Sequence, residues 1–372
     1  MSTVSGDRHA LDQLLDEQPA EQPGGPRAPR RRRWARLVLV VAAVVVVALV
    51  AAAAALWSTA PAVGHLGDPF SSIPAAQRPP VDAAAGKAQN VLLIGSDSRA
   101  NGDGSADGAD VPAGQEADWT RGGQRSDVLA VLHLSADGRS AAMVSIPRDS
   151  WVAVPGYGTT KVNAAFAYGG APLAVRTVEQ LTGVRIDHVV AIDFSGFARV
   201  TDALGGVRIC VPKTVSDQIG TVAAGCQVMD GAQALEYVRQ RKTLPGGDFD
   251  RQRRQQNWMR SVVAGATDRQ LLSDPVKLTA VVRELASSVR TDDGLGEPQL
   301  LALALAHRDL RADDVAFLQA PLATPATGYE GSQSVVYLDA AAGAQMWQAL
   351  RSDDVAAWVA AHPDAALADS VR

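Results

Sequence analysis

The stretch Asn90–Gly95, with the sequence NVLLIG, is a short and fully apolar run that ends in glycine. Such a run is typical of a strand buried on both faces in the middle of an α/β sheet. Ser96, Asp97, Ser98 and Arg99 follow directly. Ligands of open α/β sheets bind beyond the carboxyl ends of the strands, which makes Asp97 and Arg99 candidates for a ligand site. The sequence therefore predicts an α/β domain built around this strand.

Arginine and aspartate recur together at two further strand borders. Arg125 and Asp127 introduce a predicted antiparallel hairpin, residues 128–146, in which an Asp-Gly turn separates two apolar runs. Arg148 and Asp149 follow the second strand of that hairpin. A single Arg–Asp pair is more often a structural ion pair, whereas three pairs at the strand borders of one domain indicate a polar site.

The stretch Ala234–Gln256, ALEYVRQRKTLPGGDFDRQRRQQ, is dense in arginine on both sides of a Pro-Gly-Gly turn. The planar guanidinium group can hold two oxygens of one phosphate, so this stretch predicts a phosphate or pyrophosphate site, with an arginine-rich solvated helix surface as the alternative. On the helix expected after the turn, Arg251, Arg254 and Gln255 lie at i, i+3 and i+4 and share one face. Arg253 points elsewhere and is interpreted as an ordinary surface charge.

The remaining elements follow from apolar periodicity and from the positions of glycine and proline. We expect a Gly- and Asp-rich surface loop at residues 100–123, strands at residues 188–193, 207–211, 315–318 and 335–338, and helices at residues 161–168, 173–182, 194–204, 231–241, 250–264, 275–288, 298–306 and 340–351.

The composition is that of a globular protein, with 47% hydrophobic and 20% charged residues and a formal net charge of -5. No global basic field exists, which argues against nucleic acid as a partner. Residues 1–36 hold seven arginines and five acidic residues, a net +2, so the rest of the chain carries -7. Its arginines therefore lie in an acidic background, which favours a specific anion site over a general basic surface.

An uninterrupted apolar run, Leu37–Trp57, has about the length that a helix needs to cross a bilayer. Arginines at positions 30–33 and 36 precede it, and by the positive-inside rule they keep the N-terminus in the cytoplasm. The run is longer than the apolar part of a cleaved signal peptide, which is the alternative, so we favour an uncleaved single-pass anchor in the cell membrane. The expected organisation is a disordered cytoplasmic tail (1–36), a transmembrane helix (37–57), a Pro/Ala-rich linker (58–87), an extracellular domain (88–351) and a C-terminal tail (352–372).

Cys210 and Cys226 are the only cysteines. In a domain outside the membrane, a pair this close in sequence could close a short disulfide loop, with two buried thiols as the alternative.

Several catalytic chemistries lack the residues they require. There is no GxSxG motif for a serine nucleophile, and two cysteines among scattered histidines do not make a zinc site. What remains is a set of carboxylates, Asp97, Asp127, Asp149 and Asp248, together with the arginines. Mg²⁺ binds one or two carboxylates along with phosphate oxygens, and arginine and Mg²⁺ stabilise phosphoryl transfer together.

These motifs resemble those of the LytR-CpsA-Psr family of Gram-positive bacteria, membrane-anchored phosphotransferases that attach secondary glycopolymers to peptidoglycan. The resemblance implies an α/β/α sandwich with a central mixed β-sheet and an apolar tunnel for a polyprenyl chain, and it makes residues 88–351 the catalytic domain. The segments that carry it are NVLLIGSDSR (90–99), RSD (125–127), SIPRDS (145–150), KVNAAF (161–166) and residues 230–255, in which ALEYVRQR and DFDRQRRQ are the most specific.

The resemblance also implies roles for individual residues. Asp97 and Asp127 would hold Mg²⁺, and the expected catalytic set is Asp97, Asp127, Arg148, Asp149 and Arg241, in which Asp127 or Asp149 accepts the proton of the acceptor hydroxyl. The expected pyrophosphate-binding residues are Arg99, Arg125, Arg148, Arg239, Arg241, Asp248, Arg251 and Gln255.

The implied reaction moves a glycopolymer-phosphate, of teichoic acid, arabinogalactan or capsule type, from a polyprenyl-pyrophosphate carrier to peptidoglycan. Two alternatives are a phosphatase that acts on the same lipid and a noncatalytic binder or regulator of wall polymer. The high content of Ala, Val and Arg, with few Lys, indicates a GC-rich actinobacterial source.

Overall fold

The computed structural model describes residues 64–96, 126–240, 244, 248–266, 271, 289–307 and 309–366. The chain divides into two compact units, Met1–Ala60 and Pro61–Arg372, and the described residues all belong to the second. Within them, no helix combines the length and apolar character needed to cross a membrane. The tail and the transmembrane helix predicted for residues 1–57, and the helix predicted for residues 275–288, lie outside the described residues.

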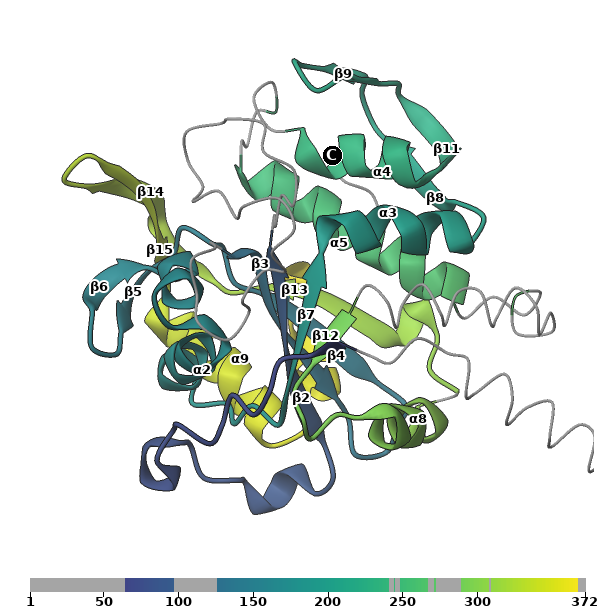
Figure 1. The fold of residues 1–372 in the computed structure, drawn as a ribbon. Coiled ribbons are helices and arrows are strands. Elements are labelled where there is room, and N and C mark those ends of the chain that lie inside the picture. The colour runs from purple at the N-terminus through teal and green to yellow at the C-terminus, as the bar shows by residue number, and fades with distance from the viewer. Residues whose placement is uncertain are drawn as a thin grey trace, which may run out of the picture. The chain divides into compact units, whose positions relative to one another are not determined.

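A seven-stranded mixed sheet, in the order β1-β12-β7-β2-β3-β4-β13, forms the centre of the domain (Figure 1). The apolar run that predicts a buried strand forms β2 (Gln89–Ser96), which pairs in parallel with β7 (His188–Asp193) and antiparallel with β3 (Ser126–Leu134). The predicted hairpin is confirmed, since β3 also pairs antiparallel with β4 (Ala141–Ser145). The other strands are β13 (Val315–Gln319), parallel to β4, β12 (Val289–Thr291), antiparallel to β7, and β1 (Gly64–His65), parallel to β12.

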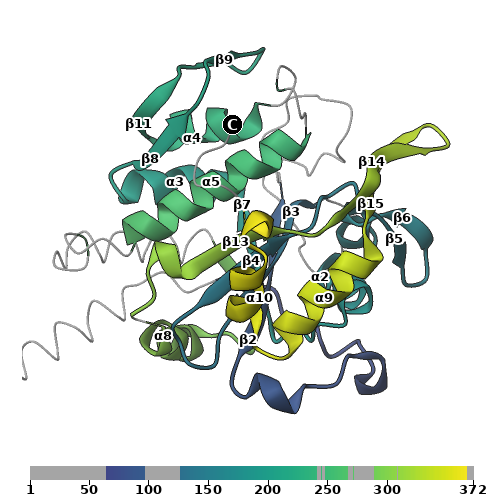
Figure 2. The same cartoon turned by 180° about the vertical axis from the view of Figure 1, so that it is seen from behind.

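Helices cover both faces of this sheet, as the family resemblance implies. Leu92 and Ile94 of β2 point into a core shared with α2 (Asn163–Thr182), α9 (Ala340–Arg351) and α10 (Val355–Ala361). Leu93 points to the opposite face, where Met259 and Val263 of α5 (Asp248–Ala266) pack against Met143 and Phe317. The alternation of side chains along a strand explains why a fully apolar run is needed at the centre. Helix α8 (Glu297–Ala306) also belongs to the described part of the domain, and Figures 1 and 2 show the arrangement from two sides.

A smaller layer beside the sheet holds the disulfide. Its strands are β8 (Val207–Val211), β9 (Val215–Ser216), β10 (Thr221–Val222) and β11 (Gly225–Met229), and its helices are α3 (Phe194–Ala203) and α4 (Gly231–Arg239). Cys210 and Cys226 face each other in the antiparallel β8–β11 pair and are joined as a disulfide, so the disulfide alternative is the one confirmed. Phe197 stacks on Trp258 of α5, which fixes this layer to the helix after the arginine-rich turn.

Two hairpins project from the other side of the sheet. One consists of β5 (Trp151–Val154) and β6 (Gly158–Lys161), and the other of β14 (Leu322–Glu330) and β15 (Gln333–Leu338). Both views show these two ribbons on the same side of the domain (Figures 1 and 2). The sequence does not predict β5–β6, and it places Lys161 in a helix, which is wrong: the residue ends β6.

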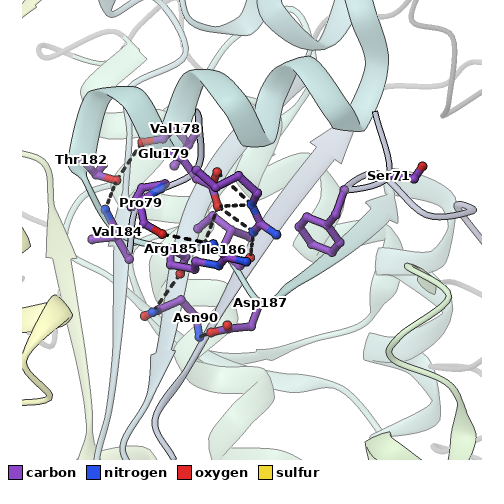
Figure 3. Close-up of polar contacts among 12 residues, drawn as sticks. Ser71, Pro79, Asn90, Val178, Glu179, Thr182, Val184, Arg185, Ile186 and Asp187 are labelled. Carbon is purple, nitrogen blue, oxygen red and sulfur yellow. Dashed lines mark hydrogen bonds and ion pairs between the residues drawn. The ribbon is translucent and has the colours of Figure 1, made fainter. Parts of the chain in front are cut away.

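The segment before β2 packs onto the domain, which corrects the prediction of a linker up to residue 87. Leu66 and Ile73 are buried in the main core. Arg78 stacks over the Phe70 ring at 4.5 Å and donates to both carboxylate oxygens of Glu179 on α2, with a shortest distance of 2.7 Å. Figure 3 shows the surrounding contacts, among them the Ile186 backbone N–H that also donates to Glu179, at 3.0 Å. The folded part therefore begins no later than Gly64.

The end of the chain is likewise part of the fold beyond the predicted boundary at residue 351. Helix α10 buries Val355 in the main core. Asp353 accepts a hydrogen bond from His133 at 2.9 Å, and Ala366 forms a bridge with Leu318. The C-terminal tail predicted for residues 352–372 is thus packed as far as Ala366.

Candidate active site

A polar pocket lies where β3 begins, where β4 ends and where α5 crosses the sheet. Because β3 and β4 are antiparallel, the start of one strand and the end of the other meet at the same edge. The residues that line the pocket are Asp127, Val128, Leu129, Ser145, Ile146, Arg148, Arg251, Gln252, Gln255, Gln256 and Met259. Four predicted site residues, Asp127, Arg148, Arg251 and Gln255, are therefore brought together from three separate segments.

The ion pair of Asp127 with Arg148 is the centre of the pocket's polar wall. Arg148 Nη1 lies 2.5 Å from Asp127 Oδ1, and each side chain is 19% exposed. No described residue bonds the second carboxylate oxygen, Oδ2. Both side chains of the pair therefore keep some exposure to solvent at the pocket.

The loop that carries Arg148 is fixed by its neighbours on three sides. Asn163 N, at the start of α2, donates to Arg148 O at 3.1 Å, and Val336 N of β15 donates to Asp149 O at 2.9 Å. Asp149 Oδ1 pairs with Lys161 Nζ at 3.1 Å, and Asp149 Oδ2 lies 3.9 Å from Arg148 Nε. Asp149 is absent from the pocket lining, so its carboxylate orients Arg148 and Lys161 instead of facing the pocket.

Helix α5 supplies the opposite wall of the pocket through Arg251, Gln252, Gln255, Gln256 and Met259. Gln256 donates from Nε2 to Ser145 Oγ at 2.5 Å and to Leu318 O at 3.1 Å, which ties the helix to the ends of β4 and β13. Its Oε1 is buried without a hydrogen-bond partner in the described part of the chain. A buried acceptor of this kind beside a pocket can be satisfied by a polar ligand.

Sequence reasoning missed the contributions of Gln256, Ser145 and Lys161. The last two lie inside the motifs SIPRDS and KVNAAF, but the sequence pattern predicts no role for these two side chains. Their roles depend on which strand ends meet, which spacing along the chain does not reveal.

Arg254 does not join the pocket, although its spacing predicts that it shares a face with Arg251 and Gln255. The side chain is 3% exposed and stacks over the Tyr237 ring at 4.6 Å. Its Nη1 donates to Gln240 Oε1 at 2.7 Å and to Tyr237 O at 3.2 Å. Burial lowers the pKa of Arg254, yet a guanidinium group stays charged at neutral pH, so this is a structural cation that joins α5 to α4.

The remaining predicted site residues stand as follows. Arg239 is exposed at the last position of α4 and does not line the pocket. The surface role predicted for Arg253 is confirmed, since its side chain is 48% exposed and pairs with Asp250 at 3.5 Å. Asp97, Arg99, Arg125, Arg241 and the side chain of Asp248 lie outside the described residues.

The pocket thus combines two guanidinium groups, one carboxylate and several amide groups, a set suited to a phosphate-containing ligand. No cluster of three or more His, Cys, Asp or Glu side chains occurs among residues the structure describes. Asp127 is the one carboxylate among the described residues that line the pocket.

Comparison with known proteins defines the class to which this fold and site belong. The model of the LytR_cpsA_psr family matches residues 71–352, and the chain belongs to this family. The match begins inside the segment that the sequence predicts as a linker, in agreement with the packing of that segment on the domain.

Curated relatives come from cell-wall biosynthesis. The probable cell wall biosynthesis protein LcpB of Corynebacterium glutamicum is 40% identical over 221 residues, covering 59% of this chain and 52% of LcpB. Cell wall biosynthesis protein LcpA of the same organism is 33% identical over 289 residues, covering 69% and 54%. The polyisoprenyl-teichoic acid–peptidoglycan teichoic acid transferase TagU of Halalkalibacterium halodurans is 34% identical over 223 residues, covering 59% and 66%. The chain thus spans about half to two thirds of the length of these relatives.

Solved structures share the fold. B. subtilis TagV superposes with a TM-score of 0.58 at 24% identity, covering 73% of this chain and 98% of TagV. The LytR-Csp2A-Psr enzyme from Actinomyces oris gives 0.56 at 22% identity, covering 73% and 93%. TagT bound to LIIa-WTA gives 0.55 at 23% identity, covering 75% and 95%.

Proposed function

We propose that this protein transfers a glycopolymer-phosphate from a polyprenyl-pyrophosphate carrier to peptidoglycan. The observation that carries the proposal is the pocket in which the Asp127–Arg148 pair faces Arg251 and Gln255 of α5. Two arginines from separate elements can hold the two phosphates of a pyrophosphate, and the name of the relative TagU, a teichoic acid transferase, supports this substrate class.

In the proposed reaction the acceptor hydroxyl oxygen bonds to the phosphorus that carries the polymer. The bond between that phosphorus and the bridging oxygen breaks, and polyprenyl phosphate leaves with the bridging oxygen. Arg148 and Arg251 neutralise the negative charge that accumulates on the phosphate oxygens and on the leaving group. Because the Arg148 loop is bonded to α2 and β15, its guanidinium group is oriented before the substrate arrives.

The proton of the acceptor hydroxyl goes to a carboxylate. Of the two candidates from the sequence, Asp127 lines the pocket and Asp149 does not, which supports Asp127.

Asp127 and Asp97 would also hold Mg²⁺, which supplies further positive charge to the pyrophosphate when bound. Asp127 is therefore proposed both for proton transfer and for metal binding. The variant Asp127→Asn separates these two roles. If the variant needs a higher Mg²⁺ concentration for half-maximal transfer, Asp127 binds the metal. If the transfer rate falls while that Mg²⁺ concentration stays the same, Asp127 accepts the proton.

We further propose that residues 37–57 anchor the protein in the cell membrane, with the domain outside. The pocket would then lie on the same side as the lipid-linked donor and the peptidoglycan. A protease added to intact cells should remove the domain, whereas protection of the domain would contradict this placement.

The reaction is tested with the full-length chain in detergent, a polyprenyl-pyrophosphate-linked glycopolymer and peptidoglycan, with the products identified by mass spectrometry. Arg148→Ala and Arg251→Ala should each lower the transfer rate by about 100-fold or more, because each removes a charge that stabilises the transition state. Arg253→Ala is the matched control on the same helix and should keep the wild-type rate, since its side chain is 48% exposed.

The products decide between this reaction and its alternatives. Polymer-phosphate joined to peptidoglycan supports the transferase. Polymer-phosphate released into water, at the same rate with and without acceptor, identifies a phosphatase. Donor binding without turnover identifies a binder or regulator.

A further inference from the structure

Two exposed tyrosines stack on each other where the β5–β6 turn meets helix α2. The ring centroids of Tyr157 and Tyr168 are 4.7 Å apart, with 24° between the ring planes. Tyr157 is 54% exposed and Tyr168 is 48% exposed. Adjacent apolar groups of this size at the surface mark binding sites more often than isolated ones do. We name this pair the tyrosine platform.

Glycines with positive φ angles lie close to both tyrosines of the tyrosine platform. Tyr157 stands between Gly156 and Gly158, whose φ angles are 84° and 73°, in the left-handed region that favours glycine. Tyr168 precedes the kink of α2, where Gly170 has a φ of 60°. Both tyrosines thus lie beside glycines whose backbone conformation other residues rarely adopt.

The two hairpins on this side of the domain are polar but almost uncharged. Between Trp151 and Lys161 the only charged residue is Lys161, which is already paired with Asp149. In the adjacent hairpin, residues 322–338, the only charged residue is Glu330. The chain as a whole is 20% charged, so this neutrality is a local feature.

Exposed hydroxyl and phenol groups take the place of charges on the same two hairpins. Thr159 of β6 and Thr324, Thr327 and Tyr329 of β14 are exposed, the last by 76%. Among residues 151–161 and 322–338, all of them described, Lys161 is the only cation and no Leu, Ile or Val is exposed, so the two hairpins suit neither a polyanion nor a bilayer. A neutral polymer with both apolar faces and hydroxyl groups, which is a glycan, matches them.

The tyrosine platform is connected to the pocket through the backbone. Val162 N donates to Ser150 O at 2.8 Å at the base of β5–β6, next to the bond from Asn163 N to Arg148 O. Strands of four residues, at about 3.3 Å per residue, place the turn of the hairpin about 13 Å from its base. A polymer held on the tyrosine platform can therefore extend to the pocket.

We propose that the tyrosine platform binds the glycan strand of the peptidoglycan acceptor. A sugar ring offers an apolar face of C–H groups that packs on an aromatic ring, while its hydroxyl groups bond to neighbouring polar side chains. Tyrosine suits this role because its rigid ring gives a large contact area for little loss of conformational freedom. The proposal rests on the proposed function, since it names the acceptor of that reaction.

Binding is measured with the full-length chain in detergent and insoluble peptidoglycan sacculi stripped of secondary polymer, with no lipid donor present. The double variant Tyr157→Ala/Tyr168→Ala should raise the apparent Kd for the sacculi about tenfold. Tyr157→Phe/Tyr168→Phe keeps both ring faces and should bind within about twofold of the wild type. Val228→Ala, at a residue of β11 that is 64% exposed, is the control and should bind as the wild type does.

Three outcomes would overturn the proposal: no binding of wild-type protein to the sacculi, equal binding by the double alanine variant, or equal losses in the phenylalanine and alanine variants. Binding of phosphatidylglycerol vesicles that depends on the two tyrosines would also overturn it, in favour of a membrane contact. Circular dichroism and the urea midpoint establish that the variants are folded.

Transfer by the same variants distinguishes this proposal from the proposed function. The double alanine variant should raise the KM for the acceptor and leave kcat at saturating acceptor unchanged. If the wild type binds sacculi through the tyrosines but transfers nothing, the reaction is wrong and the glycan site stands. If transfer proceeds and the tyrosines have no effect on it or on binding, the tyrosine platform alone is wrong.

Discussion

Arg251, Arg253 and Arg254 are near neighbours on α5, yet each lies in a different environment. Arg251 lines the pocket, Arg253 is exposed and Arg254 is buried against Tyr237. On a helix with about 100° per residue, Arg254 lies about 60° to one side of Arg251 and Gln255 about 40° to the other. Residues that share a face can therefore contact different neighbours, and here Arg254 turns toward α4 while Gln255 turns toward the pocket.

Arg254→Met should destabilise the domain without changing the residues that line the pocket. The variant leaves Gln240 Oε1 and Tyr237 O without their buried donor, so we expect the free energy of unfolding to fall by about 2 kcal/mol in urea titrations. Arg253→Ala removes an exposed i,i+3 pair and should change it by no more than about 0.5 kcal/mol. Equal losses in the two variants would contradict the assignment of Arg254 as a structural cation.

At the scale of single residues, the sequence predicts which residues form the site, but not the position of every side chain. Asp127, Arg148, Arg251 and Gln255 could be predicted because each lies at a strand border or in an arginine-rich motif, and the structure brings all four to one pocket. Asp149 could not be separated from them by spacing. The Asp149 carboxylate is held by Lys161 at the end of β6, whose Nζ lies 3.1 Å from Asp149 Oδ1.

At the scale of elements, long apolar runs predict their strands and helices well. Helix α9 has the bounds expected from its sequence, and β8 does too. Two of the segments that the sequence misreads have weak local signals: β5 and β6 are only four residues each, and residues 64–87 have the Pro/Ala composition of a linker. In residues 64–87, Leu66 and Ile73 are buried in the main core. Tertiary packing, and not local sequence, therefore determines that this segment is folded.

The contact between the N-terminal segment and α2 should depend on the Arg78–Glu179 pair. The side chains are 9% and 2% exposed, so Arg78→Met leaves a buried carboxylate without its cation and should lower the free energy of unfolding by about 3 kcal/mol. The double variant Arg78→Met/Glu179→Met should lose less than Arg78→Met alone, because it removes the unpaired charge.

An exposed ion pair between His65, on the same segment, and Asp293 provides a matched control. His65 and Asp293 form an ion pair of 3.8 Å with side chains 56% and 58% exposed, so Asp293→Ala should change the free energy of unfolding by no more than about 0.5 kcal/mol. Urea unfolding of the four proteins measures all of these differences. A double variant that is less stable than Arg78→Met would contradict the explanation by an unpaired charge.

At the scale of the whole domain, one buried histidine forms hydrogen bonds with residues that are far apart in the sequence. His133 of β3 is fully buried, and its Nδ1 lies 2.8 Å from Asn90 Oδ1 of β2 while its Nε2 lies 2.9 Å from Asp353 Oδ1. Asp353 Oδ2 also accepts from Ala136 N at 3.0 Å. The segment after α9 is thereby attached to the centre of the sheet, which no local pattern in the sequence indicates.

Asp353→Ala should make the stability of the domain more sensitive to acid. Burial lowers the pKa of His133 below its ordinary value of 6.5, and the hydrogen bond that His133 donates to Asp353 opposes this effect. Without Asp353, only the charge of Asp187 still opposes the burial effect, so the pKa of His133 in the folded domain falls further. The unfolded chain then binds a proton more readily than the folded domain as the pH falls past 6.5. Stability is then present above that pH and lost below it. Urea unfolding from about pH 7.5 to about pH 5.5 should show a gap between variant and wild type that widens toward acid. Asp354→Ala, at the exposed neighbouring residue, is the control, and its free energy of unfolding should change with pH as that of the wild type does. If the difference between Asp353→Ala and the wild type is the same at every pH, the carboxylate does not act through the charge of His133.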